Sequence, residues 1–185
     1  IHHPHYDGVD KTVAVGMPIR LLIAGRYDFY MQQAVDEAAQ AIASVASEIK
    51  DKYHITFLGK DWDKPADKLV KAGYKVEVKV FVDDYAAEVA SHDIQLTPIT
   101  VGTGTKGKVL DALANGLMVI GTLRALENIN VESSKECVLY DTGEELTQWL
   151  VRLAGDTALV ARIAEAGREA VLTRHGRKPI AQQLF

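Results

Sequence analysis

Residues 94–120 of the chain read IQLTPITVGTGTKGKVLDALANGLMVI. The first residues are mostly apolar and end at Pro98, which predicts a buried strand. A loop rich in glycine and threonine follows, then a helix over 105–115 that ends at Gly116, then a second apolar strand at 118–120. Two parallel strands need a crossover of about this length, so the segment predicts one right-handed strand, helix and strand unit.

Short apolar runs and amphipathic segments alternate on both sides of this unit. By the same criteria, further strands are predicted at residues 19–24, 55–59, 76–82 and 137–140. Further helices are predicted at residues 31–49, 63–73, 84–91, 142–153 and 156–175. Three of these helices are preceded by a side chain suited to cap them, namely Asp83 or Asp84, Thr142 and Asp156.

Six strands that alternate with helices predict an α/β fold with a Rossmann-like, doubly wound parallel sheet and helices on both faces. The third strand places Val76, Val78, Val80 and Val82 on one face and charged residues on the other, so we expect it near an edge of the sheet; the charged residues are Lys75, Glu77 and Lys79. Residues 19–185 are predicted to form this one domain. Residues 1–18 are expected to be an interdomain linker or the tail of a preceding N-terminal domain. Ile1 in place of Met suggests a processed protein or a piece of a larger one.

The composition excludes several classes of protein. The 185 residues carry 21 basic and 25 acidic side chains, a formal net charge of −4, and the charges are interleaved along the chain. Binding of nucleic acid through a basic surface is therefore disfavoured. No apolar run approaches the roughly 18 to 20 residues needed to cross a bilayer, so we expect a soluble chain. The single cysteine, Cys137, cannot form an internal disulfide, which fits a reducing compartment.

A ligand site is expected where the winding of the sheet reverses. In a doubly wound sheet the first and fourth strands are neighbours, and a crevice opens at their carboxyl ends. The loops that follow these strands are residues 25–30 and 98–108. The second loop contains three glycines, three threonines and two lysines ahead of a helix. Close backbone approach, hydroxyl groups and a helix N-terminus are features of a phosphate site, although the same residues also suit an ordinary capping turn.

Several other nucleotide and metal sites are disfavoured. Gly102–Lys108 fits the P-loop pattern G-x-x-x-x-G-K, but Val109 stands where a hydroxyl should bind Mg²⁺. Residues 25–30 lack the G-x-G-x-x-G pattern of dinucleotide-binding turns. The strand ends also lack the acidic cluster of a receiver domain. We predict no metal site, because the histidines near the N-terminus precede the fold without a carboxylate framework; they are His2, His3 and His5.

Four segments together resemble one enzyme family. Pro98–Gly121 is similar to the donor-binding segment of GT-B retaining glycosyltransferases of group 1, the GT4-like enzymes. Gly25–Tyr30 resembles the turn after the first strand of their C-terminal domain, and Val82–Tyr85 resembles a turn near the nucleotide base. Asp7–Asp10 resembles their interdomain linker. The resemblance implies the C-terminal, donor-binding half of a two-domain enzyme.

The resemblance also implies which residues bind the donor. It assigns no catalytic residue. Asp111 matches an acid that hydrogen-bonds the nucleotide ribose, whereas Thr103 stands where the family has an acid near the donor sugar. Gln32 and Gln33 stand where a lysine is usual, and Lys106 is expected to supply that charge. The donor-binding residues implied in this way are Gly25, Arg26, Tyr27, Val82, Pro98, Gly102, Thr103, Gly104, Thr105, Lys106 and Asp111.

The implied function is that of a hexosyltransferase that uses a nucleotide-diphosphate sugar, built on UDP or GDP, and an acceptor glycan or lipid. No metal or other cofactor is implied, because Arg26, Lys106 and a helix N-terminus can stabilise the diphosphate leaving group. The acceptor site would lie on the N-terminal domain, and the fragment alone would be inactive. A cytoplasmic location, with membrane contact through that domain, is also implied. The alternative that remains open is a non-catalytic, phospholigand-binding Rossmann module.

Overall fold

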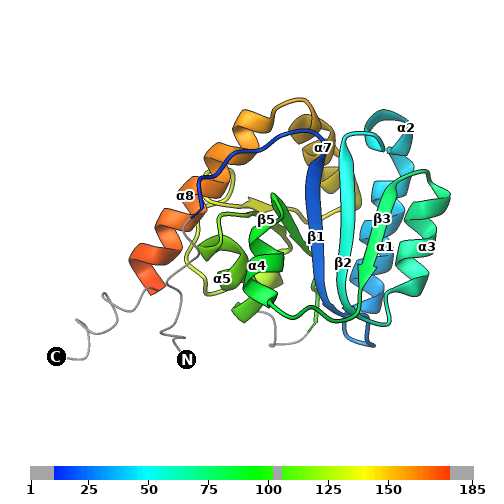
Figure 1. Ribbon diagram of the computed structural model, residues 1–185, viewed down its shortest axis with the longest axis horizontal. Helices are drawn as coiled ribbons and strands as arrows, with labels where there is room; N and C mark the ends of the chain where they lie inside the picture. The colour runs from blue at the N-terminus through cyan, green and yellow to red at the C-terminus, as the bar shows by residue number, and fades with distance from the viewer. Residues whose placement is uncertain (1–10, 102–105, 176–185) are drawn as a thin grey trace.

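The computed structural model describes residues 11–101 and 106–175, except for the side chain of Lys106 (Figure 1). Within these residues, one sheet of six parallel strands has the order β3-β2-β1-β4-β5-β6. This is the doubly wound order predicted from the sequence. The strands are β1 (Ile19–Arg26), β2 (Tyr53–Lys60), β3 (Lys75–Lys79), β4 (Ile94–Thr97), β5 (Met118–Gly121) and β6 (Val138–Leu139).

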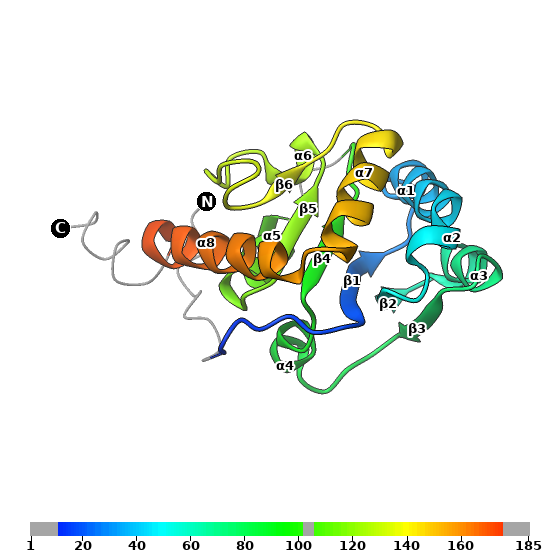
Figure 2. The same cartoon turned by 90° about the horizontal axis from the view of Figure 1, so that it is seen from above.

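Helices cover both faces of the sheet, as predicted. They are α1 (Gln32–Ser44), α2 (Ala46–Ile49), α3 (Asp63–Lys71), α4 (Tyr85–Ala90), α5 (Lys106–Ala114), α6 (Leu123–Leu126), α7 (Gly143–Ala154) and α8 (Thr157–His175). Seen from above, α1, α2, α3 and α7 lie on one side of the sheet and α4 lies on the other (Figure 2). Helix α5 packs with α4 on that second face.

The alternating direction of the side chains along β1 explains why the core has two layers, one on each face of the sheet. Ile19, Leu21 and Ile23 face the cluster that includes α1, α3 and α7, whereas Leu22 and Ala24 face the cluster that includes α4 and α5. Successive strand residues point to opposite faces, so a strand buried on both faces needs an apolar side chain at nearly every position. Helix α8 contributes to both clusters along its length.

Three helix caps agree with the sequence. Asp84, not Asp83, caps α4, and its carboxylate accepts a hydrogen bond from the Ala87 amide at 3.0 Å. The Thr142 hydroxyl accepts one from the Glu145 amide at 3.2 Å at the start of α7. Asp156 accepts one from the Leu159 amide at 2.9 Å at the start of α8. These bonds satisfy amide groups that have no partner inside the helix.

Two predicted elements differ from the structure. The helix predicted over 31–49 is interrupted at Val45, whose ψ of 14° is not helical, so α1 and α2 are separate. The strand predicted over 76–82 ends at Lys79, although it does lie at the edge of the sheet. Beyond Lys79, Phe81 is exposed and has no neighbouring strand to pair with.

Candidate functional site

The carboxyl ends of β1 and β4 lie side by side, as the predicted site requires. Leu21 pairs with Ile94 and Leu22 pairs with Gln95, and both strands run in the same direction. The chain winds from β1 toward β3 and from β4 toward β6, so the loops at this edge diverge. The crevice between such loops is where open α/β sheets bind ligands. Among the described residues, Gly25, Arg26 and Pro98 lie at or next to the ends of these two strands.

Near its carboxyl end, β1 approaches β2 closely at two paired glycines. Gly25 has φ +139° and Gly59 has φ +128°, and a Cβ atom on Gly59 would lie 1.7 Å from the Gly25 carbonyl oxygen. The indole Nε1 of Trp62 donates a hydrogen bond to the same carbonyl oxygen at 3.1 Å. This contact fixes where the chain leaves β1. Sequence reasoning named Gly25 but not Trp62.

Arg26 lies at the solvent-facing end of β1. Its Nε donates a hydrogen bond to the Asp61 carboxylate at 2.9 Å, and 67% of its side chain is exposed. Asp61 is 54% exposed, so water screens this ion pair and the pair contributes little to stability. The guanidinium is therefore free to exchange the Asp61 carboxylate for an anionic ligand at little cost.

The side chain of Tyr27 points away from the crevice. Its hydroxyl donates a hydrogen bond to Asp36 on α1 at 2.8 Å and accepts one from Lys64 on α3 at 3.2 Å. Burial and the adjacent Asp36 raise the pKa of Tyr27, so its hydroxyl stays protonated. Only the backbone of Tyr27 is left for a ligand at the sheet edge. The amide of Tyr27 itself bonds to the Lys60 carbonyl at 3.1 Å.

The loop after β4 leads into α5. Pro98 is buried, and the carbonyl of Ile99 accepts a hydrogen bond from the Thr122 hydroxyl, which joins this loop to the loop after β5. Thr122 was not predicted, and it also caps α6. Lys106 is the first residue of α5. The predicted residues Gly102, Thr103, Gly104 and Thr105 lie outside the described residues.

Val82, Tyr85 and Asp111 belong to the junction of α4 and α5. All three are half-buried, and Val82 and Tyr85 pack against the apolar cluster that contains Leu110. Burial and the negative charge of Asp111 raise the pKa of Tyr85 to about 12. Tyr85 was not predicted as a site residue; its place directly after the capping Asp84 was the available signal.

Exposed apolar side chains border the same edge of the sheet. They follow the carboxyl ends of four strands, and Phe29 and Phe81 are 86% and 81% exposed. Phe29 and Tyr30 form an edge-to-face pair with their ring centroids 5.8 Å apart. Exposed apolar side chains that gather into one large patch usually mark a surface that contacts another molecule or domain. We call these residues the apolar rim: Phe29, Tyr30, Val80, Phe81, Val101 and Leu123.

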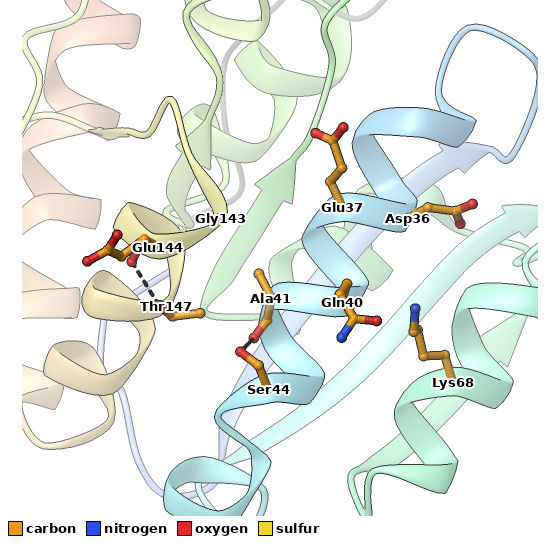
Figure 3. Close-up of a pocket in the computed structure, with 9 residues that line it drawn as sticks. All are labelled: Asp36, Glu37, Gln40, Ala41, Ser44, Lys68, Gly143, Glu144 and Thr147. Carbon is orange, nitrogen blue, oxygen red and sulfur yellow. Dashed lines mark hydrogen bonds between the residues drawn. The ribbon is translucent and has the colours of Figure 1, made fainter.

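A groove of about 640 Å³ lies elsewhere, between α1 and α7 with Lys68 of α3 at one side (Figure 3). Asp36, Glu37 and Glu144 surround it, and Lys68 is the only basic residue of its lining. This charge opposes binding of a diphosphate. The groove is also lined by helices α1, α3 and α7 and not by the loops that follow β1 and β4. We therefore do not regard it as the phosphate site.

No group of three or more His, Cys, Asp or Glu side chains in the described residues is placed to hold a metal ion. Cys137 is buried, and burial together with Glu136 raises the pKa of its thiol to about 12. It is therefore not a reactive thiolate at neutral pH. In the same described residues, no helix is both long and apolar enough to cross a membrane.

The sequence profile described as glycosyl transferase-like matches residues 33–185. The chain belongs to this glycosyl transferase-like family. The matched region includes β2 to β6 and thus every strand of the sheet except β1. No curated protein sequence matches the chain significantly.

Solved structures of glycosyltransferases share the fold. The C-terminal domain of LpcC from Francisella tularensis, a group 1 glycosyl transferase, superposes with a TM-score of 0.74 at 17% identity, over 92% of this chain and 96% of that one. HepE from Anabaena, in complex with UDP and glucose, superposes with a TM-score of 0.70 at 16% identity, over 90% of this chain and 48% of that one. WaaG, a glycosyltransferase involved in lipopolysaccharide biosynthesis, superposes with a TM-score of 0.71 at 18% identity, over 92% of this chain and 47% of that one. The fold is therefore that of the C-terminal domain of a GT-B, group 1 glycosyltransferase.

The chain spans the whole of the LpcC domain but less than half of the HepE and WaaG chains. The apolar rim lies at the edge of the sheet that carries the predicted site.

Proposed function

We propose that the chain is the donor-binding domain of a retaining glycosyltransferase, which transfers a sugar from a nucleotide-diphosphate sugar to an acceptor glycan or lipid. The proposal is carried by the sequence TVGTGTKGK, residues 100–108, which follows β4 in the chain, together with the parallel pairing of β4 with β1. Membership of the glycosyl transferase-like family supports it. HepE, which shares the fold, has been solved with UDP and with UDP-glucose.

The proposed chemistry needs stabilisation of a leaving diphosphate. Negative charge grows on the nucleoside diphosphate as the bond to the sugar breaks, and groups already in place can stabilise it. Arg26 is exposed at the end of β1, and the N-terminus of α5 carries a partial positive charge that favours an anion. Lys106 adds a formal charge at the start of that helix. In this proposal no metal ion is required.

We assign the ribose to Asp111. This residue lies in the middle of α5, between the phosphate end of the helix and α4, and it is half-buried. A carboxylate accepts hydrogen bonds from both hydroxyl groups of a ribose. Val82, in the loop before α4, is assigned to the base because its apolar side chain lines the same junction.

The acceptor is assigned to a second domain. The chain corresponds to less than half of HepE and WaaG, and the apolar rim is the surface that we expect such a domain to approach. A cytoplasmic enzyme that meets its acceptor at a membrane face, through that domain, is consistent with this arrangement.

Calorimetry on the chain with UDP, GDP, ADP and inorganic pyrophosphate tests the proposal. Asp111→Ala should weaken binding of the nucleoside diphosphate and leave pyrophosphate binding nearly unchanged. Lys106→Ala should weaken both by about 1.5 to 3 kcal/mol, because a charged hydrogen bond to phosphate is lost. Equal losses for both ligands in Asp111→Ala would contradict the ribose assignment. Binding of pyrophosphate with no preference for any nucleotide would favour the non-catalytic phospholigand module.

A further inference from the structure

One buried hydroxyl group near the proposed site has no hydrogen-bond partner among the described residues. It is the Oη atom of Tyr85, which is shielded from solvent. Two other buried tyrosines are satisfied: the Tyr53 hydroxyl donates to the Leu150 carbonyl at 2.7 Å, and the Tyr74 hydroxyl donates to the Ile42 carbonyl at 2.7 Å. A buried polar group without a partner costs about 1 to 3 kcal/mol. Such a group needs an explanation, and a ligand that completes its bonding is one.

The surroundings of Tyr85 indicate where that ligand would lie. Tyr85 is the first residue of α4, three residues after Val82, and both pack against the cluster that contains Leu110 of α5. Asp111 follows Leu110, and its charge acts on the Tyr85 hydroxyl. Helices α4 and α5 are in contact. The hydroxyl therefore lies at the same junction as the carboxylate that we assign to the ribose.

The two groups have complementary hydrogen-bonding roles. A carboxylate can only accept hydrogen bonds, so Asp111 can take the protons of ribose hydroxyl groups but cannot satisfy their oxygen lone pairs. A tyrosine hydroxyl can donate to one of those oxygens. Because the pKa of Tyr85 is raised to about 12, its hydroxyl keeps its proton at neutral pH.

We propose that the Tyr85 hydroxyl donates a hydrogen bond to the ribose of the bound nucleotide, next to Asp111, and so contributes to recognition of the nucleoside part of the donor. This inference rests on the proposed function. It adds a residue that makes the site selective for a nucleoside diphosphate over a bare diphosphate. It also accounts for a buried hydroxyl that has no hydrogen-bond partner among the described residues.

The variant Tyr85→Phe removes the hydroxyl and keeps the ring. Affinity for the nucleoside diphosphate that binds the wild-type chain best, among UDP, GDP and ADP, should fall about three- to tenfold in calorimetry, as expected for one neutral hydrogen bond. Affinity for inorganic pyrophosphate should not change. The thermal midpoint without ligand should stay the same or rise, because the variant no longer buries an unpaired hydroxyl.

Tyr74→Phe is the matched control. It removes a buried hydroxyl that is bonded to Ile42 between α1 and the start of β3, so its thermal midpoint should fall while nucleotide affinity stays at the wild-type value. Wild-type nucleotide affinity in Tyr85→Phe would overturn the inference and leave the proposed function standing. An equal loss for pyrophosphate would also overturn it. A wild-type chain that binds none of the three nucleotides would refute the proposed function, and the inference with it.

Discussion

Gly25 and Gly59 show how single residues shape the end of the sheet. The Gly59 Cα faces the Gly25 carbonyl so closely that a methyl group would overlap it, at 1.7 Å. We expect Gly59→Ala to lower the free energy of unfolding by more than about 2 kcal/mol, because a φ of +128° also disfavours any side chain. Urea unfolding measures this change. Gly16→Ala is the control, since a Cβ there would meet no atom within 4 Å; a Gly59→Ala chain as stable as that control would contradict the prediction.

The environment of His92 lets us predict how the free energy of unfolding depends on pH. Its ring is buried, and Nδ1 lies 2.8 Å from the Glu88 carbonyl oxygen, which requires a proton on Nδ1. Burial lowers the pKa of His92; the Glu88 carbonyl and carboxylate oppose this shift, whereas Arg20 and Lys79 add to it. The folded chain therefore resists a second proton that the unfolded chain accepts below a pH of about 6.5. Stability should be full above that pH and should fall as the pH drops below it.

Urea unfolding between pH 5 and pH 7 tests the contribution of His92. In His92→Gln, which keeps an amide donor for the Glu88 carbonyl, stability should depend less on pH over this range than in the wild-type chain. The remaining slope belongs to His54, whose pKa burial also lowers. Glu136, whose pKa is lowered by Arg174 in spite of its burial, loses its contribution only at pH values below about 4.5. An unchanged slope in His92→Gln would show that His92 does not titrate in this way.

At the scale of elements, the stability of helix α7 depends on the hydrogen bonds of its first turn. The Thr142 hydroxyl accepts a hydrogen bond from the Glu145 amide, and the Glu145 carboxylate accepts one from the Asp141 amide at 2.8 Å. Thr142→Ala should lower the free energy of unfolding by about 1 kcal/mol, as loss of a helix cap usually does. The control is Thr147→Ala, because the Thr147 hydroxyl bonds only to the Glu144 carbonyl within the same exposed turn. Equal effects of the two substitutions in thermal unfolding would argue against the cap.

At the scale of the whole molecule, the apolar rim and the proposed donor site share one edge of the sheet. Transfer requires an acceptor held opposite the donor, and orientation of this kind can lower a barrier by roughly 7 to 11 kcal/mol. We therefore expect the chain of residues 1–185 to bind a nucleotide sugar without transferring or hydrolysing it above background. Product analysis with radiolabelled nucleotide sugar and a mixture of acceptors measures this. Transfer at the rate of a full-length glycosyltransferase would place the acceptor site within these residues.

The order of the strands could be predicted from the sequence because the signals for it are local. Buried strands such as Ile19–Arg26 are mostly continuous apolar runs, whereas the helices between them repeat apolar residues every three or four positions. Crossovers between parallel strands are almost always right-handed. Caps such as Asp84 and Asp156 act within three residues of themselves. From these signals follow the doubly wound sheet and the edge where a ligand is expected. The glycosyl transferase-like family was recognised from motifs along the same elements.

Only the tertiary structure decided how side chains distant in sequence meet. Whether Tyr27 faces a ligand or the core depends on Asp36 and Lys64, which belong to two other helices. The close approach of β2 to the Gly25 carbonyl, near the end of β1, depends on the absence of a side chain at Gly59 in the neighbouring strand. Whether the Tyr85 hydroxyl finds a partner depends on how α4 packs against α5. Packing and hydrogen bonding between elements act over distances in space that no spacing along the chain encodes. The sequence by itself therefore determined the doubly wound sheet and the edge at which a ligand is predicted, and only the tertiary structure decided where side chains such as that of Tyr27 lie.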